Sequence, residues 1–367
     1  MQNSSTPDPN RFAPIFVVGC GRSGTTLLRL MLEAHSQVAI PGESHFVYWI
    51  ARMRARGKWP SELSGPGARE ALITYLEGLH FHHEWRVPFD VIAAAVRDPA
   101  VTTHGEAFQA VFDCYRAAHG KKCWGDKTPM HVQYMLMLDK LIPGCRFVHI
   151  IRDARPVAQS LMTRKWGPRH ISHAGHYWNW LVLSGMLGGA VLGPGRYYQL
   201  TFESLVAEKE TQLRDLANWL GIGFEAGMLD YYQTESAKNY AKAGSVAQRL
   251  ATPVDTGRLT FWKESLPPRD QRSIARQSGA LLSHLGYEVG PLTTSAQRQK
   301  QQIENILSPD FIDDLRQEVG RDGRTPPSAL TAQASRTRQY ADFMLGRLEP
   351  WARHSVRWQC DVAAMLG

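Results

Sequence analysis

The sequence contains few cysteines, and no two of them form a known sequence motif. Five cysteines are scattered over 367 residues, without any Cys-x-x-Cys pair. An odd and widely spaced set argues against both a disulfide framework and a zinc site. We therefore expect free thiols, no metal site and a reducing, cytoplasmic setting.

Long apolar runs are also missing. The most apolar stretch, residues 181–193, is too short and too rich in glycine to cross a bilayer. The first residues are polar and include proline, unlike the basic and then apolar start of a secretory signal. We expect no transmembrane segment. A hydrophobic content of 43% is enough for a full core, which excludes a disordered or fibrous chain.

Positive charge is in excess, with a formal net charge of +8 that residues 1–289 carry almost entirely. The chain has no run of Lys and Arg with interleaved aromatic residues, which nucleic-acid-binding segments often show. We expect an anionic ligand and no nucleic-acid partner.

Three segments have the pattern of a strand followed by a helix. The expected pairs are 15–19 with 26–34, 146–151 with 154–163, and 197–202 with 203–220. Strands that alternate with helices predict an α/β fold, in which a parallel sheet is flanked by helices on both faces. A glycine-rich loop follows the first strand, so the sheet should be P-loop-like.

Further helices are expected near residues 45–56, 68–79, 105–119 and 130–141. Residues 236–263 are irregular and predict a long loop that could close over a ligand. Composition shifts after residue 290, where a Gln-rich helix over 295–307 and two further helical stretches are expected. We predict a main domain over 14–289 and a helical extension over 290–367, which could pack on the core, bind a partner or form a homodimer contact.

The loop after the first strand has the spacing of a phosphate-binding loop. Residues 19–26 read Gly-Cys-Gly-Arg-Ser-Gly-Thr-Thr. Glycines let backbone N–H groups converge on a phosphate, and the following helix adds its positive end. A P-loop kinase needs a lysine after the last glycine and an aspartate for magnesium. Here Thr25 follows Gly24 and the cation is Arg22, which disfavours a kinase or NTPase but leaves it as an alternative.

A second motif follows the strand over 146–151. Arg152 stands at the strand end, and Ser160 lies eight residues further, two turns into the next helix. At this spacing the guanidinium and the hydroxyl can meet on one phosphate. The alternative makes Arg152 a surface ion-pair partner and Ser160 a filler of the helix.

These two motifs together resemble those of the sulfotransferase family that uses 3′-phosphoadenosine 5′-phosphosulfate (PAPS), in its bacterial and carbohydrate type. The resemblance covers about residues 14–289. In that family, a basic residue followed by Ser-Gly-Thr-Thr binds the 5′-phosphosulfate, and an arginine and a serine bind the 3′-phosphate. The resemblance implies PAPS as donor, without a metal. The donor contacts that it implies are Gly21, Arg22, Ser23, Gly24, Thr25, Thr26, Arg152 and Ser160.

Two later segments are similar to the family more loosely. Gly257-Arg258 looks like a late segment that closes on the 3′-phosphate and adenine, which makes Arg258 a further donor contact. Phe202 stands where the family usually has a tyrosine. A phenyl ring can still stack beside adenine, but it cannot donate the hydrogen bond of the tyrosine.

The resemblance also implies catalytic residues. Glu43 lies 21 residues after Arg22, and tyrosyl-protein and some carbohydrate sulfotransferases have a glutamate base at a similar place. The alternatives are that Glu43 only favours the start of a following helix, or that His45 is the base. Lys127 belongs to an Asp-Lys-Thr-Pro element found in many such enzymes and, with Arg22, would neutralise charge at the sulfuryl group. Asp126 could orient Lys127 or cap a helix.

The sequence thus predicts an enzyme that transfers a sulfuryl group from PAPS to an acceptor hydroxyl. The tyrosyl-protein enzymes have an arginine where His45 stands, so a carbohydrate, lipid or secondary-metabolite hydroxyl fits better than a protein tyrosine. The alternatives are a P-loop kinase or NTPase and a non-catalytic nucleotide-binding module. His149 and the aromatic residues near Trp178 are expected to pack in the core.

Overall fold

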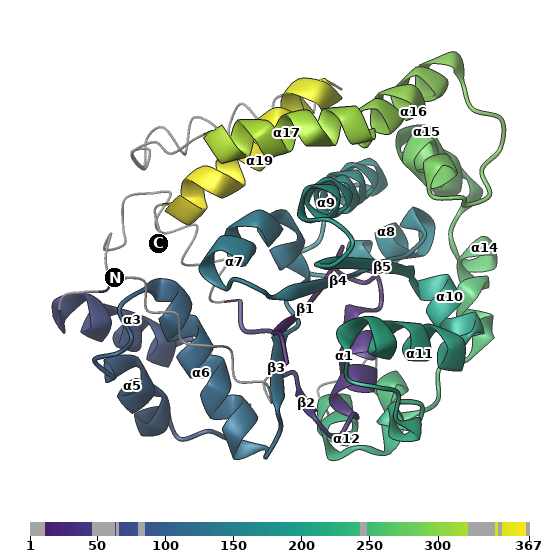
Figure 1. The fold of residues 1–367 in the computed structure, drawn as a ribbon. Coiled ribbons are helices and arrows are strands. Elements are labelled where there is room, and N and C mark those ends of the chain that lie inside the picture. The colour runs from purple at the N-terminus through teal and green to yellow at the C-terminus, as the bar shows by residue number, and fades with distance from the viewer. Residues whose placement is uncertain are drawn as a thin grey trace.

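The computed structural model describes residues 12–45, 63, 66–79, 85–242, 248–321, 342–343 and 347–364. In this part of the chain, helices surround a central sheet of five strands in the order β2-β3-β1-β4-β5. Every strand pair in this sheet is parallel. The predicted α/β fold with a parallel sheet is confirmed (Figure 1).

The five strands are short. They are β1 Ile15–Val18, β2 Val38–Ala39, β3 Cys123–Asp126, β4 Arg146–Ile151 and β5 Tyr197–Thr201. The helices up to the fifth strand are α1 Thr25–Glu33, α3 Pro66–Gly78, α5 Phe89–Arg97, α6 His104–Ala118, the 3-10 helix η1 Pro129–Gln133, α7 Met135–Leu141, α8 Ala154–Met162 and α9 Ile171–Leu192. After it come α10 Phe202–Ala207, α11 Lys209–Leu220, α12 Glu235–Ala241, the 3-10 helix η5 Thr256–Leu259, α14 Phe261–Ser265, α15 Pro268–His284, α16 Thr294–Ile306, α17 Pro309–Arg321 and α19 Leu348–Ala364.

β1 lies in the middle of the sheet, between β3 and β4. Phe16 is opposite Asp126 in one pair and Phe147 in the other. The residues of β1 are at most 1% exposed, as expected for a parallel strand that is covered on both faces. Parallel strands end at the same edge of a sheet, so the residues that follow β1, β3 and β4 come together.

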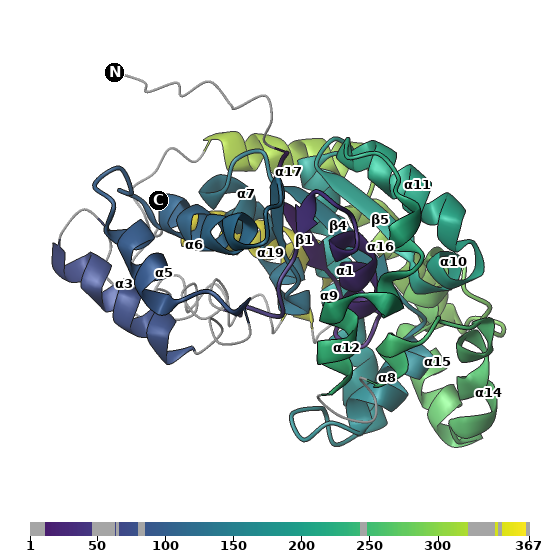
Figure 2. The same ribbon diagram turned by 90° about the horizontal axis from the view of Figure 1, so that it is seen from below.

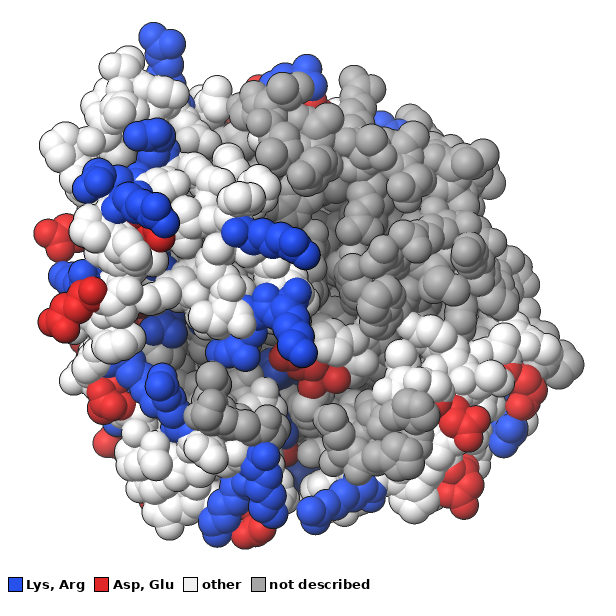
Figure 3. All heavy atoms as spheres, turned by 180° about the vertical axis from the view of Figure 1, so that it is seen from behind, with Lys and Arg blue, Asp and Glu red and all other residues white. Residues whose placement is uncertain are grey.

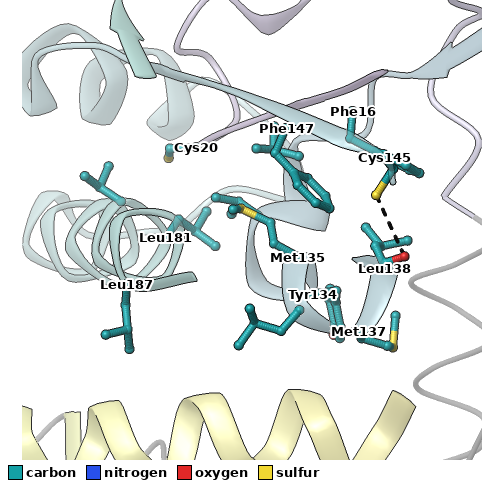
Figure 4. Packing of buried hydrophobic residues seen from close by; sticks show 14 of the residues in the cluster. Phe16, Cys20, Tyr134, Met135, Met137, Leu138, Cys145, Phe147, Leu181 and Leu187 are labelled. Carbon is teal, nitrogen blue, oxygen red and sulfur yellow. Dashed lines mark hydrogen bonds between the residues drawn. The ribbon is translucent and has the colours of Figure 1, made fainter. Parts of the chain in front are cut away.

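Two apolar layers cover the sheet, one on each face. Phe16 and Phe147 face a layer that includes α6, α7 and α9, whereas Ile15 and Val17 face a layer built by α1 and α11. Figure 4 shows the first layer, where Leu181 from α9 and Met135 from α7 lie below the sheet residues. The alternation of side chains along each strand assigns successive residues to opposite layers.

The C-terminal helices pack on the first of these layers. Trp351 of α19 is fully buried, and its ring lies 5.8 Å from that of Trp180 in α9. Ile303 of α16 and Leu315 of α17 belong to the same apolar cluster as α7 and α9. The helix expected over 295–307 is present as α16. The domain boundary at residue 290 stays a prediction.

Some expected elements differ in detail. The helix expected over 203–220 is two helices, because Glu208 leaves the helical conformation between α10 and α11. The long loop expected over residues 236–263 is wrong in part, because α12, η5 and α14 form short helices there. Residues 243–247 of this segment lie outside the described residues. Residues 46–56, most of the helix expected over 45–56, also lie outside them. None of the helices described is long and apolar enough to cross a membrane.

Candidate active site

The phosphate loop joins the end of β1 to the start of α1. Gly24 has φ +96°, and a Cβ there would lie 2.4 Å from Cδ2 of Phe202. Both the left-handed backbone and the close ring therefore require glycine at this position. Arg22 also has a positive φ of 76°, which is uncommon for a residue with a side chain and typical of functional loops. The predicted strand, turn and helix are all present.

This loop has the features of an anion site. The Ser23 hydroxyl is fully buried and has no hydrogen-bond partner among the residues that the structure describes. Buried polar groups are nearly always paired, so an unpaired one indicates a ligand or water. The first turn of α1 contains no acidic residue, and its N–H groups give a partial positive charge. The loop fits a phosphate or phosphosulfate group.

The arginine and serine motif lies beside this loop. Arg22 Nε donates to Ser160 Oγ over 3.0 Å, so the two motifs meet in space. Arg152 stacks on the Phe202 ring at 4.0 Å, and its Nη2 donates to the Arg258 carbonyl oxygen over 3.3 Å. The three segments that should bind a nucleotide with two phosphate positions therefore converge at the carboxyl edge of the sheet.

The Arg152 side chain is buried and held in place by its neighbours. Burial lowers the pKa of its guanidinium, which Glu203 partly offsets, and the group still stays charged. Its Nε is buried and unpaired within the described part of the chain. Asp153 accepts from the backbone N–H of Arg155 over 2.8 Å, as a helix N-cap should. Arg152 is thus fixed between a strand end and a capped helix, with donor capacity to spare.

The candidate catalytic residues also lie close together. Lys127 Nζ donates to Glu43 Oε1 over 2.6 Å and to Thr26 Oγ1 over 3.3 Å. His45 Nε2 lies 3.0 Å from Glu43 Oε2. Burial alone would raise the pKa of Glu43, but Lys127 and His45 outweigh it and lower the pKa to about 2. Glu43 is therefore an ionised carboxylate at the edge of the phosphate loop.

The structure places the other singled-out residues as follows. Phe202 is only 4% exposed and lies between Gly24 and Arg152, so its contact with adenine stays a prediction. His149 is buried in β4, and burial lowers its pKa to about 3. Trp178 is also buried and donates to the Arg152 carbonyl oxygen over 2.9 Å. His149 and Trp178 are thus buried, as expected, but only Nδ1 of His149 is paired, with the Tyr197 hydroxyl at 2.7 Å, and its Nε2 has no partner among the described residues.

Sequence reasoning missed two features of the site. Burial lowers the pKa of Arg22, and Arg164 contributes to this shift, which places a second cation near the loop. Trp166 is 66% exposed and lies near Gly21. Arg164 and Trp166 both lie in the basic and aromatic stretch that follows α8. This composition is the signal from which a surface beside the phosphate loop could have been predicted. Figure 2 shows α8, α12 and α14 on one side of the molecule, and Figure 3 views that side, where Lys and Arg side chains gather.

Comparison with known proteins identifies the family. The model of the sulfotransferase family matches residues 14–226, which is more than half of the chain. The chain belongs to the sulfotransferase family. It is therefore an enzyme of the transferase class, and the family predicted from the two motifs is confirmed.

Named relatives extend this result. A "Putative protein-tyrosine sulfotransferase" of Caenorhabditis briggsae is 24% identical over 289 residues, covering 75% of this chain and 89% of that protein. "Protein-tyrosine sulfotransferase 1" of Danio rerio is 24% identical over 306 residues, covering 78% of this chain and 76% of the relative. The sulfotransferase domain of the Synechococcus PCC 7002 olefin synthase has the same fold, with a TM-score of 0.52 and 19% identity over 79% of this chain and the whole of that domain.

Proposed function

We propose that this sulfotransferase transfers the sulfuryl group of PAPS to the hydroxyl of an acceptor, with Glu43 as the general base. The observation that carries the proposal is the cluster of Glu43, Lys127 and Thr26 at the phosphate loop. A base, a cation and a phosphate cradle within hydrogen-bond reach of one another are the groups that sulfuryl transfer requires.

The reaction exchanges one S–O bond for another. The acceptor oxygen attacks sulfur in line with the bridging oxygen, and the bond from sulfur to that oxygen breaks. The electron pair stays on the 5′-phosphate of the leaving nucleotide, adenosine 3′,5′-bisphosphate. Glu43 takes the proton of the acceptor hydroxyl. The side chains of Lys127 and Arg22 face the developing negative charge, with the N-terminus of α1.

Donor binding should change the basicity of Glu43. In the structure, Lys127 is bonded to Glu43, and this pairing keeps the pKa of the carboxylate low. A phosphosulfate in the loop would draw Lys127 away and add negative charge nearby, and both effects raise the pKa of Glu43. A higher pKa makes the carboxylate a better base. Binding of the donor would therefore make Glu43 a stronger base for the acceptor hydroxyl.

For the acceptor, we propose a carbohydrate, lipid or secondary-metabolite hydroxyl. Its support is His45, whose imidazole occupies the position beside Glu43 where tyrosyl-protein enzymes are expected to have an arginine. A protein tyrosine is the second candidate, and it is supported by the similarity to proteins named protein-tyrosine sulfotransferases.

Sulfuryl transfer from PAPS labelled at sulfur tests the function. Purified protein is incubated with a panel of sugars, lipids, metabolite alcohols and tyrosine peptides, and labelled products are identified by mass spectrometry. We expect transfer to at least one alcohol. Nucleotide binding without transfer to any acceptor would support the non-catalytic module instead, and magnesium-dependent consumption of ATP would support a kinase or NTPase.

The variant Arg152→Ala tests the donor site. It should weaken binding of adenosine 3′,5′-bisphosphate by about 1.5–3 kcal/mol, the contribution of a hydrogen bond to a charged group. Binding of adenosine 5′-phosphate should barely change, because it lacks the 3′-phosphate. Isothermal calorimetry measures both, with Arg214→Ala as control, since Arg214 is an exposed partner of Glu210. Equal losses for both nucleotides would show that Arg152 does not bind the 3′-phosphate.

A further inference from the structure

A buried carboxylate lies directly behind the candidate base. Asp126 ends β3 and is wholly buried. Its Oδ1 accepts from the Ser44 hydroxyl over 2.7 Å and from the Thr128 hydroxyl over 3.3 Å. Its Oδ2 lies 2.8 Å from Nδ1 of His131 in η1. The Asp126 carboxylate thus contacts side chains from three segments, namely the loop after β2, the turn after β3 and the helix η1.

The position of this carboxylate is set by the sheet. Asp126 is in register with Phe16 of the central strand. A Cβ at the preceding residue, Gly125, would lie 2.5 Å from the Ile15 carbonyl oxygen, so the strand packs as closely as a glycine allows. Asp126 therefore ends a strand that is closely packed against the central strand β1.

Chain neighbours connect Asp126 to the catalytic pair. Ser44 directly follows Glu43, and Lys127 directly follows Asp126. The bond from Ser44 to Asp126 is thus a second link between the two backbones that carry the base and the cation. The first link is the Lys127–Glu43 ion pair. The backbone N–H of His45 adds a weaker bond to the Thr128 hydroxyl over 3.4 Å.

The Lys127–Glu43 ion pair and the Ser44–Asp126 hydrogen bond have different parts during turnover. In the proposed function, Lys127 turns toward the donor and Glu43 toward the acceptor hydroxyl, so their mutual bond is given up. The loop that carries Glu43 then depends on its other contacts to stay in place. His45 has a positive φ of 56°, a backbone state that persists only where surrounding contacts enforce it.

We propose that Asp126 is a positioning residue, which holds the Glu43 loop at the phosphate loop through the Ser44 hydroxyl while Lys127 is engaged with the donor. This inference rests on the proposed function. It assigns Ser44 and Asp126 a part in placing the base, without contact to either substrate. A misplacement of about 1 Å can lower a rate by about a hundredfold.

The variant Ser44→Ala tests this role, because it removes one hydroxyl and leaves Asp126 with its other two partners. We expect kcat to fall by about tenfold to a hundredfold, and the affinity for adenosine 3′,5′-bisphosphate to change by less than about twofold. Ser44→Thr keeps the hydroxyl and should restore most of the activity. Ser184→Ala is the matched control, since Ser184 is also buried but bonds within α9, and it should keep the wild-type rate.

A double-mutant cycle separates positioning from a loss of fold. Ser44 acts through Glu43, so adding Ser44→Ala to Glu43→Gln should lower the remaining rate by less than about twofold. An equal loss in both backgrounds, or no loss in the wild-type background, would overturn the inference. If Ser44→Ala does not fold, Ser44→Cys serves in the same cycle. Failure of the proposed function is distinguishable, because the wild-type enzyme itself would then transfer no sulfuryl group from PAPS.

Discussion

At the scale of single residues, Glu43 is partly buried and still ionised, because Lys127 and His45 overcome the effect of burial on its pKa. The ionised form is the one that the proposed base needs, because only a deprotonated carboxylate can accept the proton of the acceptor hydroxyl. Conversely, Lys127 is only 1% exposed and relies on this carboxylate as a counter-charge. An ion pair with one fully buried member is weak evidence for stability, but it is sensitive to the loss of the partner of that member.

Replacing Glu43 by Gln tests the assignment of the base. This change keeps the size of the side chain but removes its basic oxygen, so kcat should fall by about a hundredfold to ten-thousandfold. Nucleotide affinity should hardly change, because the phosphate-binding groups lie on other segments. Steady-state rates and calorimetry measure the two effects. Near-normal turnover of Glu43→Gln, together with loss of activity in His45→Ala, would assign the base to the histidine.

The depressed pKa of Glu43 also predicts how stability depends on pH. The folded-state pKa of about 2 lies below the ordinary value of 4.5, so the contribution of this carboxylate is present above about pH 4.5 and is lost as the pH falls toward 2. The difference in unfolding free energy between the wild type and Glu43→Gln should therefore shrink from pH 5 to pH 2. Urea denaturation at several pH values measures it, and a difference that is constant with pH would contradict the ion pair.

At the scale of secondary-structure elements, the units with regular apolar patterns could be predicted from the sequence. β1, β4, α1 and α8 agree with their expected ranges to within one or two residues, since each has a clear period and an end signal. β3 was missed because Cys-Trp-Gly-Asp contains a glycine and lacks a run of β-branched residues. Its glycine is required by the close approach to Ile15, a tertiary cause that local sequence does not show.

Part of the candidate site could also be predicted from the sequence. The spacing of the motifs predicted the phosphate loop and the Arg152 motif, and in the structure both lie at the same edge of the sheet. The Ser44–Asp126 bond joins residues 82 positions apart, which no local pattern can reveal. The Phe202 ring over Gly24 depends likewise on how α10 packs against the loop.

The turn before α1 should be intolerant of a side chain. Gly24→Ala combines a left-handed backbone, which costs an L-residue about 1–2 kcal/mol, with a Cβ at 2.4 Å from the Phe202 ring. We expect a lower unfolding free energy and loss of nucleotide binding. The control is Gly221→Ala, where φ is +71° but nothing lies within 4 Å of the added Cβ. Equal stability losses in the two variants, with nucleotide binding kept, would show that the ring contact is unimportant.

At the scale of the whole molecule, composition could not decide whether the C-terminal helices are an appendage or part of the core. The shift after residue 290 suggests an appendage, but α16, α17 and α19 bury side chains in the same apolar cluster as α7 and α9. Figure 1 shows α17 and α19 lying across the outside of α9 and α7. The edge of the sheet that carries the candidate site is built by other segments. Stability and catalysis should therefore respond differently to changes in these helices.

The variant Trp351→Ala tests this separation. Trp351 is fully buried between Trp180 and Phe343, and truncation of a buried aromatic residue to alanine costs about 3–5 kcal/mol. Thermal unfolding should shift to a lower temperature by several degrees or more, while the KM for PAPS measured well below that temperature stays close to the wild-type value. The residues proposed to contact the two phosphates lie between Gly21 and Arg258, whereas Trp351 belongs to the apolar cluster that contains α7 and α9. An unchanged unfolding temperature would mean that the extension is only loosely attached, and a changed KM would mean that it supports the site as well as the fold.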